Sequence, residues 1–529
     1  MPIAYWISLP LLKVFEQSER LIKNLDSKTG MTTGDNDRFL RNWYEICSNK
    51  FYALNNYDEW YPYNKGGGYR KWYGNLLNVI DWQNSGKSIK NFKKSTIRNE
   101  QYYFKKCITW NLITTTNISV RFLEYPSVMG DAGPACYCEN EEKLKYTLGL
   151  LNSVVANKIL NIINPTMNYS CGVMESFPFK YRKSEQILKL VDKSIELSKE
   201  DWNSFEISWS FMVHPLIEYK EGSNYGKDLD NWNYNIKDAY ESWKLNCDEK
   251  FKLLKNNEEE LNRIFINIYE LSDELTPEVD EKDITIRKAD RLREIKSLIS
   301  YAVGCMFGRY SLDKKGLIHA GGEFDESRYK KFKVDPDNII PITDETYFDD
   351  DIVQRFKKFI EVAFGKETLN ENLDFIADTL GKKGTETSEE TIRRYFVNDF
   401  FNDHCKIYQK KPIYWLLDSG KKNGFKALIY MHRYNENLIP KARLDYLHRV
   451  QTIYEKLLSD VNYKLTTDLS MTDKKEAKNR QTDLMAKLQE IKEYDEKIAH
   501  IANQRISIDL DDGVKVNYEK FKDILAKIK

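Results

Sequence analysis

The spacing of apolar residues divides the chain into a mixed N-terminal part and a largely helical C-terminal part. Short aromatic and β-branched runs separated by turns fill residues 46–135 and predict a strand-containing domain. In residues 141–163 apolar side chains recur every three or four positions, which predicts one helix that Pro165 ends. From about residue 183 onward the pattern is amphipathic and charged. We therefore expect an α+β fold that is predominantly α-helical, with a mixed α/β domain followed by a long helical C-terminal region.

Breaks in the helical pattern define the expected segments. Long helices are predicted over residues 185–198 and 234–272, and the polar, acidic stretch at 321–351 is the best internal boundary. Residues 441–505 form a helical pattern broken near 466–472, which is typical of a helical hairpin that serves as a spacer or docking surface. We expect four segments: a helical connector (1–45), a mixed domain (46–182), a helical spacer (183–330) and a helical C-terminal domain that ends in the hairpin (331–529).

Overall charge and composition exclude several classes of protein. The 529 residues carry 81 basic and 81 acidic side chains, which argues against a uniformly basic binder but leaves room for a local basic site. No apolar run approaches the ~20 residues that span a bilayer, so we expect no membrane partner. The eight scattered cysteines are typical of reduced thiols in a cytoplasmic protein. Cys136 and Cys138 have no second pair at zinc-site spacing and are expected to be structural.

Basic charge is concentrated in one stretch of this neutral chain. Between Lys65 and Lys106 there are ten basic residues and two acidic ones, a net charge of +8 over 42 residues, interleaved with aromatic side chains. Lysine and arginine neutralise phosphates, arginine and amide side chains read base edges, and aromatic rings stack on displaced bases. A solvated positive face with its rings turned into the core is the alternative. For a double-stranded DNA partner, the expected contacts are Tyr69, Arg70, Lys71, Trp72, Lys87, Lys90, Lys93, Lys94 and Lys105, with Arg98, Asn99 and Gln101 at base edges.

A polar turn precedes an aromatic and basic segment near the N-terminus. Residues 29–36 combine Gly30 and Gly34, which can adopt positive φ, with short hydrogen-bonding side chains. Asp35 or Asn36 is expected to cap the helix that follows. A capped turn before an ordinary helix is the alternative interpretation. The candidate DNA contacts in this stretch are Thr33, Gly34, Asp35, Asn36 and Arg38.

No catalytic or metal-binding residue is predicted in this sequence. It contains neither a phosphate-binding loop nor a dinucleotide-binding glycine motif, and its six histidines form no metal pair. His214 is expected to be packed or capping. His404 lies near Asp399 and Asp403, but no second carboxylate cluster of the usual nuclease form accompanies them. Residues 164–167 begin like the Asn-Pro-Pro-Tyr motif of amino-methyltransferases but continue with threonine and methionine, so we interpret them as a helix end.

Several motifs follow one another in a characteristic order. They are Thr32–Leu40, Gly68–Tyr73 with Asn78–Trp82, Ile97–Asn99, Tyr103–Lys105 leading to Ile108–Trp110, Leu148–Ser153 with Ile163–Thr166, Ser208-Trp209 with His214–Leu216, and Lys411–Leu416 with Ser419–Tyr434. In order and spacing they resemble the C-terminal portion of PglX (BrxX) proteins, which are the adenine-specific DNA methyltransferases of BREX phage-defence systems. The resemblance extends over nearly the whole chain.

The resemblance implies a division of labour between two halves of an enzyme. In such proteins an N-terminal region carries the S-adenosyl-L-methionine loop and the Asn-Pro-Pro-Tyr motif, and a target-recognition domain and a helical region follow. Residues 46–182 would be the target-recognition domain, and the turn at 29–36 would join it to the catalytic part. The chain alone is therefore expected to bind no cofactor and to be inactive, because S-adenosyl-L-methionine would bind to the missing catalytic half of the complete enzyme.

The function expected from the resemblance is DNA target recognition and scaffolding for an N6-adenine methyltransferase. A protein-interaction module is the alternative. In that case the helices at 234–272 and 441–505 would dock other BREX subunits, and the basic stretch would be incidental.

Overall fold

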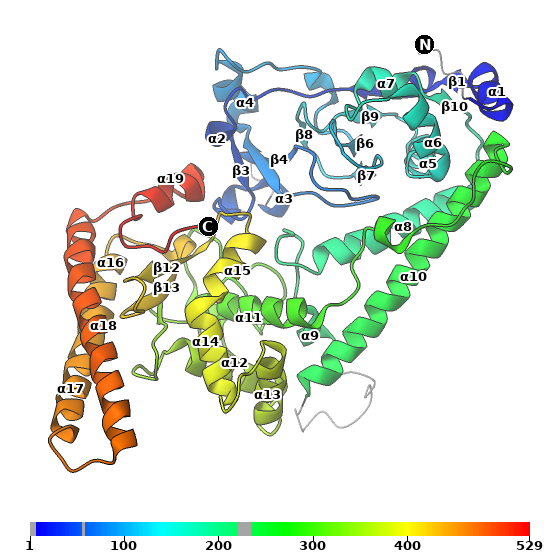
Figure 1. Ribbon diagram of the computed structural model, residues 1–529. Coiled ribbons are helices and arrows are strands. Elements are labelled where there is room, and N and C mark those ends of the chain that lie inside the picture. Colours follow the sequence, from blue (N-terminus) through cyan, green and yellow to red (C-terminus); the bar gives the residue numbers. More distant parts are fainter. Residues whose placement is uncertain (1–6, 56–58, 221–233) are drawn as a thin grey trace. The chain divides into compact units, whose positions relative to one another are not determined.

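The computed structural model of the chain describes residues 7–55, 59–220 and 234–529 (Figure 1). Its first compact unit, unit 1, comprises Met1–Trp43, Asn49–Phe211 and Lys244–Ala289. Unit 2 comprises Tyr44–Ser48, Met212–Trp243 and Asp290–Lys529. The expected α+β class with helix predominating is confirmed. The four segments expected from the sequence stay a prediction.

Unit 1 contains the strands predicted for the mixed domain, and also short strands at residues 19–42, where the sequence predicted a helical connector. One four-stranded sheet has the order β2 (Asp26–Lys28), β9 (Ala135–Tyr137), β6 (Cys107–Trp110), β7 (Val120–Leu123), with every neighbouring pair antiparallel. A second has the order β3 (Leu40–Asn42), β5 (Asn78–Asp81), β4 (Trp60–Asn64), β8 (Val128–Met129), in which only β4 and β8 run parallel. A short antiparallel pair joins β1 (Glu19–Arg20) to β10 (Pro178–Phe179).

The helix predicted over residues 141–163 is two helices, α5 (Glu141–Leu151) and α6 (Val154–Ile163). The break has a local cause. The amide of Asn152 accepts from the backbone N–H of Val120 (2.9 Å) and donates to its carbonyl (3.0 Å), which ties this residue to β7. The Ser153 hydroxyl then caps α6 by accepting from the N–H of Ala156 at 3.3 Å. The expected end of the pattern is confirmed, because α6 stops at Ile163.

Helices pack in succession on the strands of unit 1. Helix α5 packs against β6 and β7, and α8 (Glu185–Asn203) packs against α5 (Figure 1). Helix α10 (Ile236–Tyr269) agrees with the helix predicted over 234–272, and its residues from Lys244 onward belong to unit 1. The smaller helices of this unit are α1 (Leu9–Gln17), α2 (Asn36–Phe39), α3 (Tyr52–Asn55), α4 (Gln83–Lys90) and α7 (Cys171–Glu175).

Unit 2 surrounds a small, largely buried sheet with helices. Strand β13 (Lys426–Tyr430) lies between β11 (Ile339–Pro341) and β12 (Tyr414–Asp418), and both pairings are antiparallel. These strands account for the aromatic-rich sequence at 410–434. The helices of this part are α9 (Pro215–Glu218), α11 (Arg291–Phe307), α12 (Ile352–Phe364), α13 (Leu369–Thr379), α14 (Ser388–Asn398) and α15 (Phe400–Ile407).

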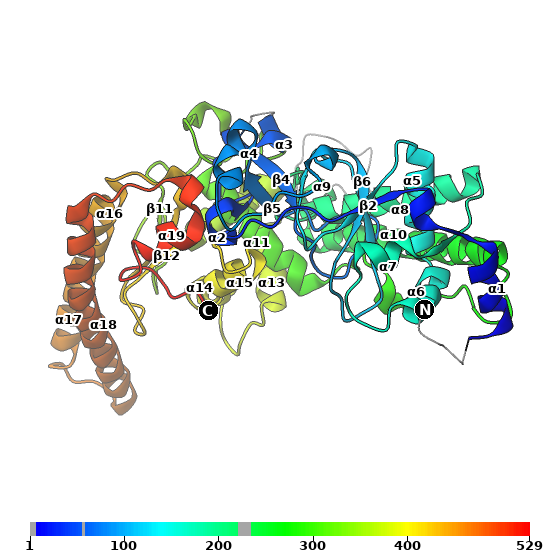
Figure 2. The same cartoon turned by 90° about the horizontal axis from the view of Figure 1, so that it is seen from above.

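The C-terminal region of unit 2 contains the predicted helical hairpin. After α16 (Leu438–Lys441) and a π-helical segment at Ala442–Leu447, helix α17 (His448–Lys464) runs beside α18 (Met471–Gln504) in both views (Figure 2). Their connection agrees with the predicted break near 466–472. Helix α19 (Gly513–Glu519) follows. None of the helices that the structure describes is both long and apolar enough to cross a membrane.

The close packing of α5 on α8 can be tested by a substitution at Gly149. A Cβ at Gly149 in α5 would lie 2.8 Å from a methyl carbon of buried Val191 in α8. Gly149→Ala is therefore expected to lower the free energy of unfolding by about 1–3 kcal/mol through overpacking, although alanine is the better helix former by about 0.5–1 kcal/mol. The control is Gly172→Ala in α7, where the nearest atom is 3.9 Å away, and that variant should be neutral or slightly more stable. Urea unfolding of both variants measures the difference, and a stabilising Gly149→Ala would contradict this packing.

Candidate nucleic-acid interface

The polar turn at residues 29–36 is a capped turn before a very short helix. Asp35 caps α2, because its Oδ1 accepts from the N–H of Arg38 at 3.1 Å, as expected. Helix α2 is only four residues long, since the chain enters β3 at Leu40. Thr33 is buried and its hydroxyl donates to Oδ1 of Asn36 at 2.5 Å, so the expected contact of Thr33 with DNA is corrected to an internal role.

Gly34 lets the turn approach the basic stretch at close range. Its φ is +72°, and a Cβ at this position would lie 2.5 Å from backbone atoms of Lys94. Two backbone hydrogen bonds continue the contact, from the N–H of Thr32 to the carbonyl of Thr96 (3.0 Å) and from the N–H of Thr96 to the carbonyl of Thr32 (2.9 Å). The structure thus brings together two motifs that lie about sixty residues apart in the sequence.

Side chains strengthen the same junction. The rings of Phe39, the last residue of α2, and of Phe92, which follows α4, meet edge to face with centroids 5.4 Å apart. The exposed guanidinium of Arg38 lies 5.0 Å from the first ring centroid and 5.3 Å from the second. Asn99 donates from its amide to the carbonyl of Thr29 at 2.9 Å. Asn99 therefore holds the basic stretch against the turn, and we leave it out of the contacts proposed below.

Six exposed cations of the turn segment and the basic stretch have no ion pair with a described acidic residue. We call them the exposed basic set: Arg38, Lys87, Lys93, Lys94, Arg98 and Lys105. Lys90 differs, because it forms an ion pair with Glu100 that neutralises its charge locally. Gln101 is exposed, as are Gly34 and Asn36, whereas Asp35 is half-buried. Part of the candidate list is thus exposed, and its contact with DNA stays a prediction.

Helix α4 contains a left-handed turn that was not among the candidate contacts expected from the sequence. Asn84, Ser85 and Gly86 all have positive φ (51°, 57° and 72°). A Cβ at Gly86 would lie 2.8 Å from the buried ring of Trp82. Left-handed non-glycine residues cost free energy and cluster at functional sites. The exposed side chains of Asn84 and Ser85 are held directly before Lys87, and the Asn-Ser-Gly sequence was the available signal.

Three expected DNA contacts are buried instead, and this corrects the prediction for Lys71, Trp72 and Arg70. The Nζ of Lys71 lies 2.6 Å from Oε2 of Glu258 in α10, and the indole N–H of Trp72 donates to Oε1 of the same carboxylate at 2.8 Å. Burial by itself would lower the pKa of Lys71, but the charge and hydrogen bond of Glu258 outweigh it and raise that pKa. The ammonium therefore stays charged without facing solvent.

Arg70 is fixed in the same way against α8. Its Nη2 lies 2.8 Å from Oδ2 of Asp201 and donates to the carbonyl of Ser198 at 2.9 Å. Burial tends to raise the pKa of Asp201, yet the charges of Arg287 and Arg70 lower it overall. The neighbouring Tyr69 is half-buried. The Gly68–Tyr73 motif therefore joins the sheet that contains β7, which we call the strand layer, to α8 and α10. No cation in this motif is available for a phosphate.

A further buried cation supports the glycine loop at residues 66–68. Arg121 in β7 is fully buried, and burial followed by the charge of Arg70 lowers its pKa to about 10. Its Nη2 donates to Oδ1 of Asn111 at 2.9 Å. The same Oδ1 accepts from the N–H of Gly67 (3.1 Å), and the Asn111 amide donates to the Gly67 carbonyl (2.6 Å). Sequence reasoning missed this residue, because nothing local marks a strand arginine as buried.

His214, His404 and Cys136 all make contacts inside the fold, and the expected capping role of His214 is confirmed. His214 caps α9 by accepting from the N–H of Leu216 at 3.2 Å. The Nε2 of His404 accepts from the N–H groups of Ile413 (3.0 Å) and Tyr414 (3.1 Å). Burial lowers the pKa of both imidazoles to about 3, so they are neutral acceptors. Cys136 is buried with its sulfur 3.0 Å from the Ser27 hydroxyl.

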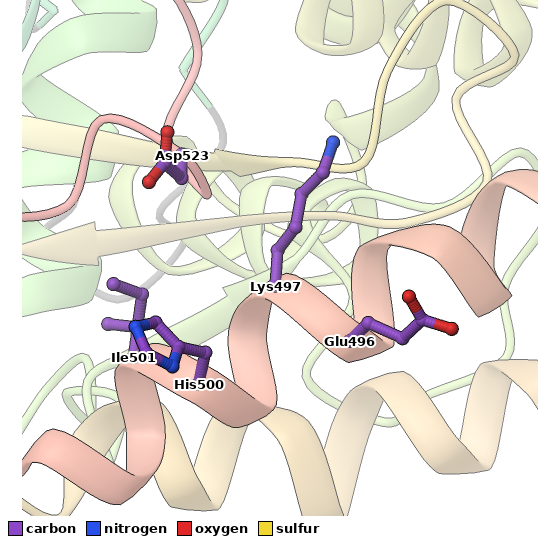
Figure 3. A pocket seen from close by; sticks show the side chains of 5 residues that line it. All are labelled: Glu496, Lys497, His500, Ile501 and Asp523. Carbon is purple, nitrogen blue, oxygen red and sulfur yellow. The ribbon is translucent and has the colours of Figure 1, made fainter.

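One shallow cavity of about 330 Å³ lies on unit 2, beside α18. It is lined by Glu496, Lys497, His500, Ile501 and Asp523 (Figure 3). In the close view the Glu496 carboxylate points away from Asp523, and the polar groups do not converge on one point. Converging polar groups are what a catalytic or cofactor site requires. We therefore assign no chemistry to this cavity.

Comparison with known proteins supports the resemblance over the whole chain. No family model matches the chain. It is 42% identical over 536 residues to the adenine-specific methyltransferase PglX of Lacticaseibacillus casei (strain Zhang), an alignment that covers 98% of this chain and 44% of that protein. It is 37% identical over 563 residues to the adenine-specific methyltransferase BrxX of Escherichia coli O9:H4 (strain HS), covering 100% of this chain and 45% of the relative. The chain thus spans less than half the length of these curated relatives.

The burial of Lys71 generates a stability prediction. Glu258→Ala leaves the Lys71 ammonium and the Trp72 indole N–H without their partner, and is expected to lower the free energy of unfolding by about 3–5 kcal/mol. Glu260→Ala, two residues along the same helix, removes exposed contacts to Arg263 and Gln186 and should cost at most about 1 kcal/mol. Urea unfolding of the two variants measures the difference. Equal shifts in midpoint would show that the buried pair does not hold the strand layer to α10.

Proposed function

We propose that this chain is the DNA target-recognition and scaffold part of an N6-adenine site-specific DNA methyltransferase of a BREX phage-defence system. The catalytic half, which would bind S-adenosyl-L-methionine, is supplied elsewhere. The observation that carries the proposal is the junction between the turn at 29–36 and the stretch at 87–105, where cations without acidic partners are exposed. Similarity to two adenine-specific methyltransferases supports it.

The proposed contacts follow from burial and charge. Arg38, Lys87, Lys93, Lys94 and Lys105 bind phosphates, which sets the register of the duplex. Arg98, Gln101 and the amide of Asn84 read base edges, because guanidinium and amide groups match the donor and acceptor pattern of the major groove. Gly34 and Asn36 bring the backbone of the turn close to the duplex. The buried cations of the Gly68–Tyr73 motif act only by fixing the fold.

A second candidate is the protein-interaction module, favoured by the end of the hairpin in unit 2. Tyr463 near the end of α17 is 73% exposed, and Met471 at the start of α18 is 87% exposed. Large apolar side chains exposed together at a tip are typical of a docking surface. A pull-down with other BREX subunits in nuclease-treated lysate separates the two functions, because association bridged by DNA is then lost while direct docking persists.

The DNA-binding proposal predicts a salt-dependent affinity that depends on named lysines. Fluorescence anisotropy with duplex DNA should give a linear fall of log affinity with log salt concentration. Lys93→Ala combined with Lys94→Ala should weaken binding and reduce that slope by about two, since each lysine neutralises about one phosphate. Lys474→Ala combined with Lys475→Ala in α18 changes the net charge equally and is the control. Equal effects of the two double variants, or binding that ignores salt, would refute the proposed interface.

The proposed division of labour predicts the methyl-transfer activity of the purified chain. With labelled S-adenosyl-L-methionine and duplex DNA, we expect no transfer above background, because these 529 residues contain no Asn-Pro-Pro-Tyr motif. The positive control is a complete adenine-specific DNA methyltransferase under the same conditions. Transfer by the chain alone would mean that it carries a catalytic site of its own.

A further inference from the structure

Three carboxylates that nothing above accounts for converge in unit 2. Asp335 and Asp337 lie on the loop before β11, and Asp350 lies just before α12. Each contributes an oxygen, and these three oxygens all lie within 4.8 Å of one another. Such a cluster is unfavourable unless something positive binds to it, because like charges at this separation repel strongly in a partly buried site. The cluster is therefore the first element of a candidate ligand site.

The unpartnered oxygen of Asp335 is the second, independent observation. Asp335 has no exposed surface. Its Oδ1 accepts from the N–H of Ile339 at 3.2 Å, whereas its Oδ2 is buried and has no hydrogen-bond partner in the described part of the chain. Buried carboxylate oxygens are nearly always hydrogen-bonded or bound to a metal. This oxygen is therefore available to a bound cation.

The side chains that contact the cluster directly supply one positive charge. The Tyr446 hydroxyl lies 2.9 Å from Oδ2 of Asp337 and 2.6 Å from Oδ2 of Asp350, but it has one hydrogen and can donate to only one of them. Lys441 lies 3.3 Å from Asp337 and is the one cation within ion-pair distance of the three carboxylates among the described residues. One ammonium cannot neutralise three carboxylates.

Two arginines near the cluster donate hydrogen bonds to other groups. The guanidinium of Arg433 donates to the backbone carbonyl of Asp335 at 2.8 Å, and not to its carboxylate. The guanidinium of Arg355 donates to the carbonyl of Lys333 at 2.7 Å. Their positive charges make the potential at the cluster less negative, but neither arginine donates a hydrogen bond to the free oxygen of Asp335.

We propose that Asp335, Asp337 and Asp350 bind a divalent cation with the chemistry of Ca²⁺. Ca²⁺ takes oxygen ligands at about 2.3–2.6 Å, so two oxygens on one ion can be up to about 5 Å apart, whereas Mg²⁺ at about 2.1 Å would require them to be closer. The three oxygens lie within 4.8 Å of one another, which is inside the limit for the larger ion. The Tyr446 hydroxyl and solvent complete the shell. The ion links the loop before β11 to the start of α12 and to the π-helical segment at the base of the hairpin.

Terbium luminescence tests the site directly, and independently of the proposed function. The full chain, freed of metal with EDTA and dialysed at pH 8, is titrated with Tb³⁺ under excitation of tyrosine. We expect emission sensitised by Tyr446, displacement of Tb³⁺ by Ca²⁺, and a higher melting temperature in Ca²⁺ than in EDTA. Asp350→Asn should weaken Tb³⁺ binding at least tenfold. Asp349→Asn is the matched control, because it removes the same charge from the exposed neighbouring residue and should leave binding unchanged.

The competing explanation for the cluster is a proton that Asp335 shares with Asp337. Burial and the charge of Asp337 raise the pKa of Asp335 to about 7. Tyr446→Phe separates the explanations while keeping all three carboxylates. That variant should lose most Tb³⁺ emission but keep the stabilisation by Ca²⁺, measured against its own melting temperature in EDTA. Absence of any Ca²⁺ effect at pH 8, or equal Tb³⁺ binding by Asp350→Asn and Asp349→Asn, overturns the proposal.

Discussion

The carboxylate of Glu258 holds two side chains of one motif, and the arrangement of unit 1 depends on it. It binds the ammonium of Lys71 and the indole N–H of Trp72, while Asp201 binds the adjacent Arg70. Removing charges from water is costly, so such pairs persist only where the geometry is good and each partner is satisfied. Here the result is a strand layer fixed to α8 and α10. The two cations of the Gly68–Tyr73 motif thereby hold the fold together.

The cations of the basic stretch therefore fall into a buried group and an exposed group. The cations at 70–71 are internal, and the cations that remain exposed lie mainly at 87–105. The turn at 29–36 meets that second group through Gly34 and the backbone pairing of Thr32 with Thr96. The positive charge that we propose for DNA is therefore presented on a backbone fixed by hydrogen bonds. A fixed backbone favours recognition, since less freedom is lost on binding.

Local patterns in the sequence predicted the features that depend on local physics. The helix over 234–272, the hairpin, the cap at Asp35 and the capping role of His214 all follow from periodicity or short-range hydrogen bonding, and all are present. The errors concern partners distant in sequence. Nothing near Lys71 indicates that Glu258 lies beside it, and nothing near Asn152 indicates that its amide binds β7 and divides a helix. The cluster of Asp335 and Asp350 was missed for the same reason.

The central claim is that DNA binds at the junction of the turn and the exposed basic set, and amide hydrogen exchange with and without duplex DNA tests it most directly. At low salt we predict slower exchange in peptides covering residues 29–38 and 87–105 when DNA is present, and no change in peptides from the tip of the hairpin at 463–475. The peptide covering 68–73 should be protected equally with and without DNA, because its side chains are already buried. Protection confined to the hairpin, or no protection by DNA anywhere in unit 1, would contradict the account.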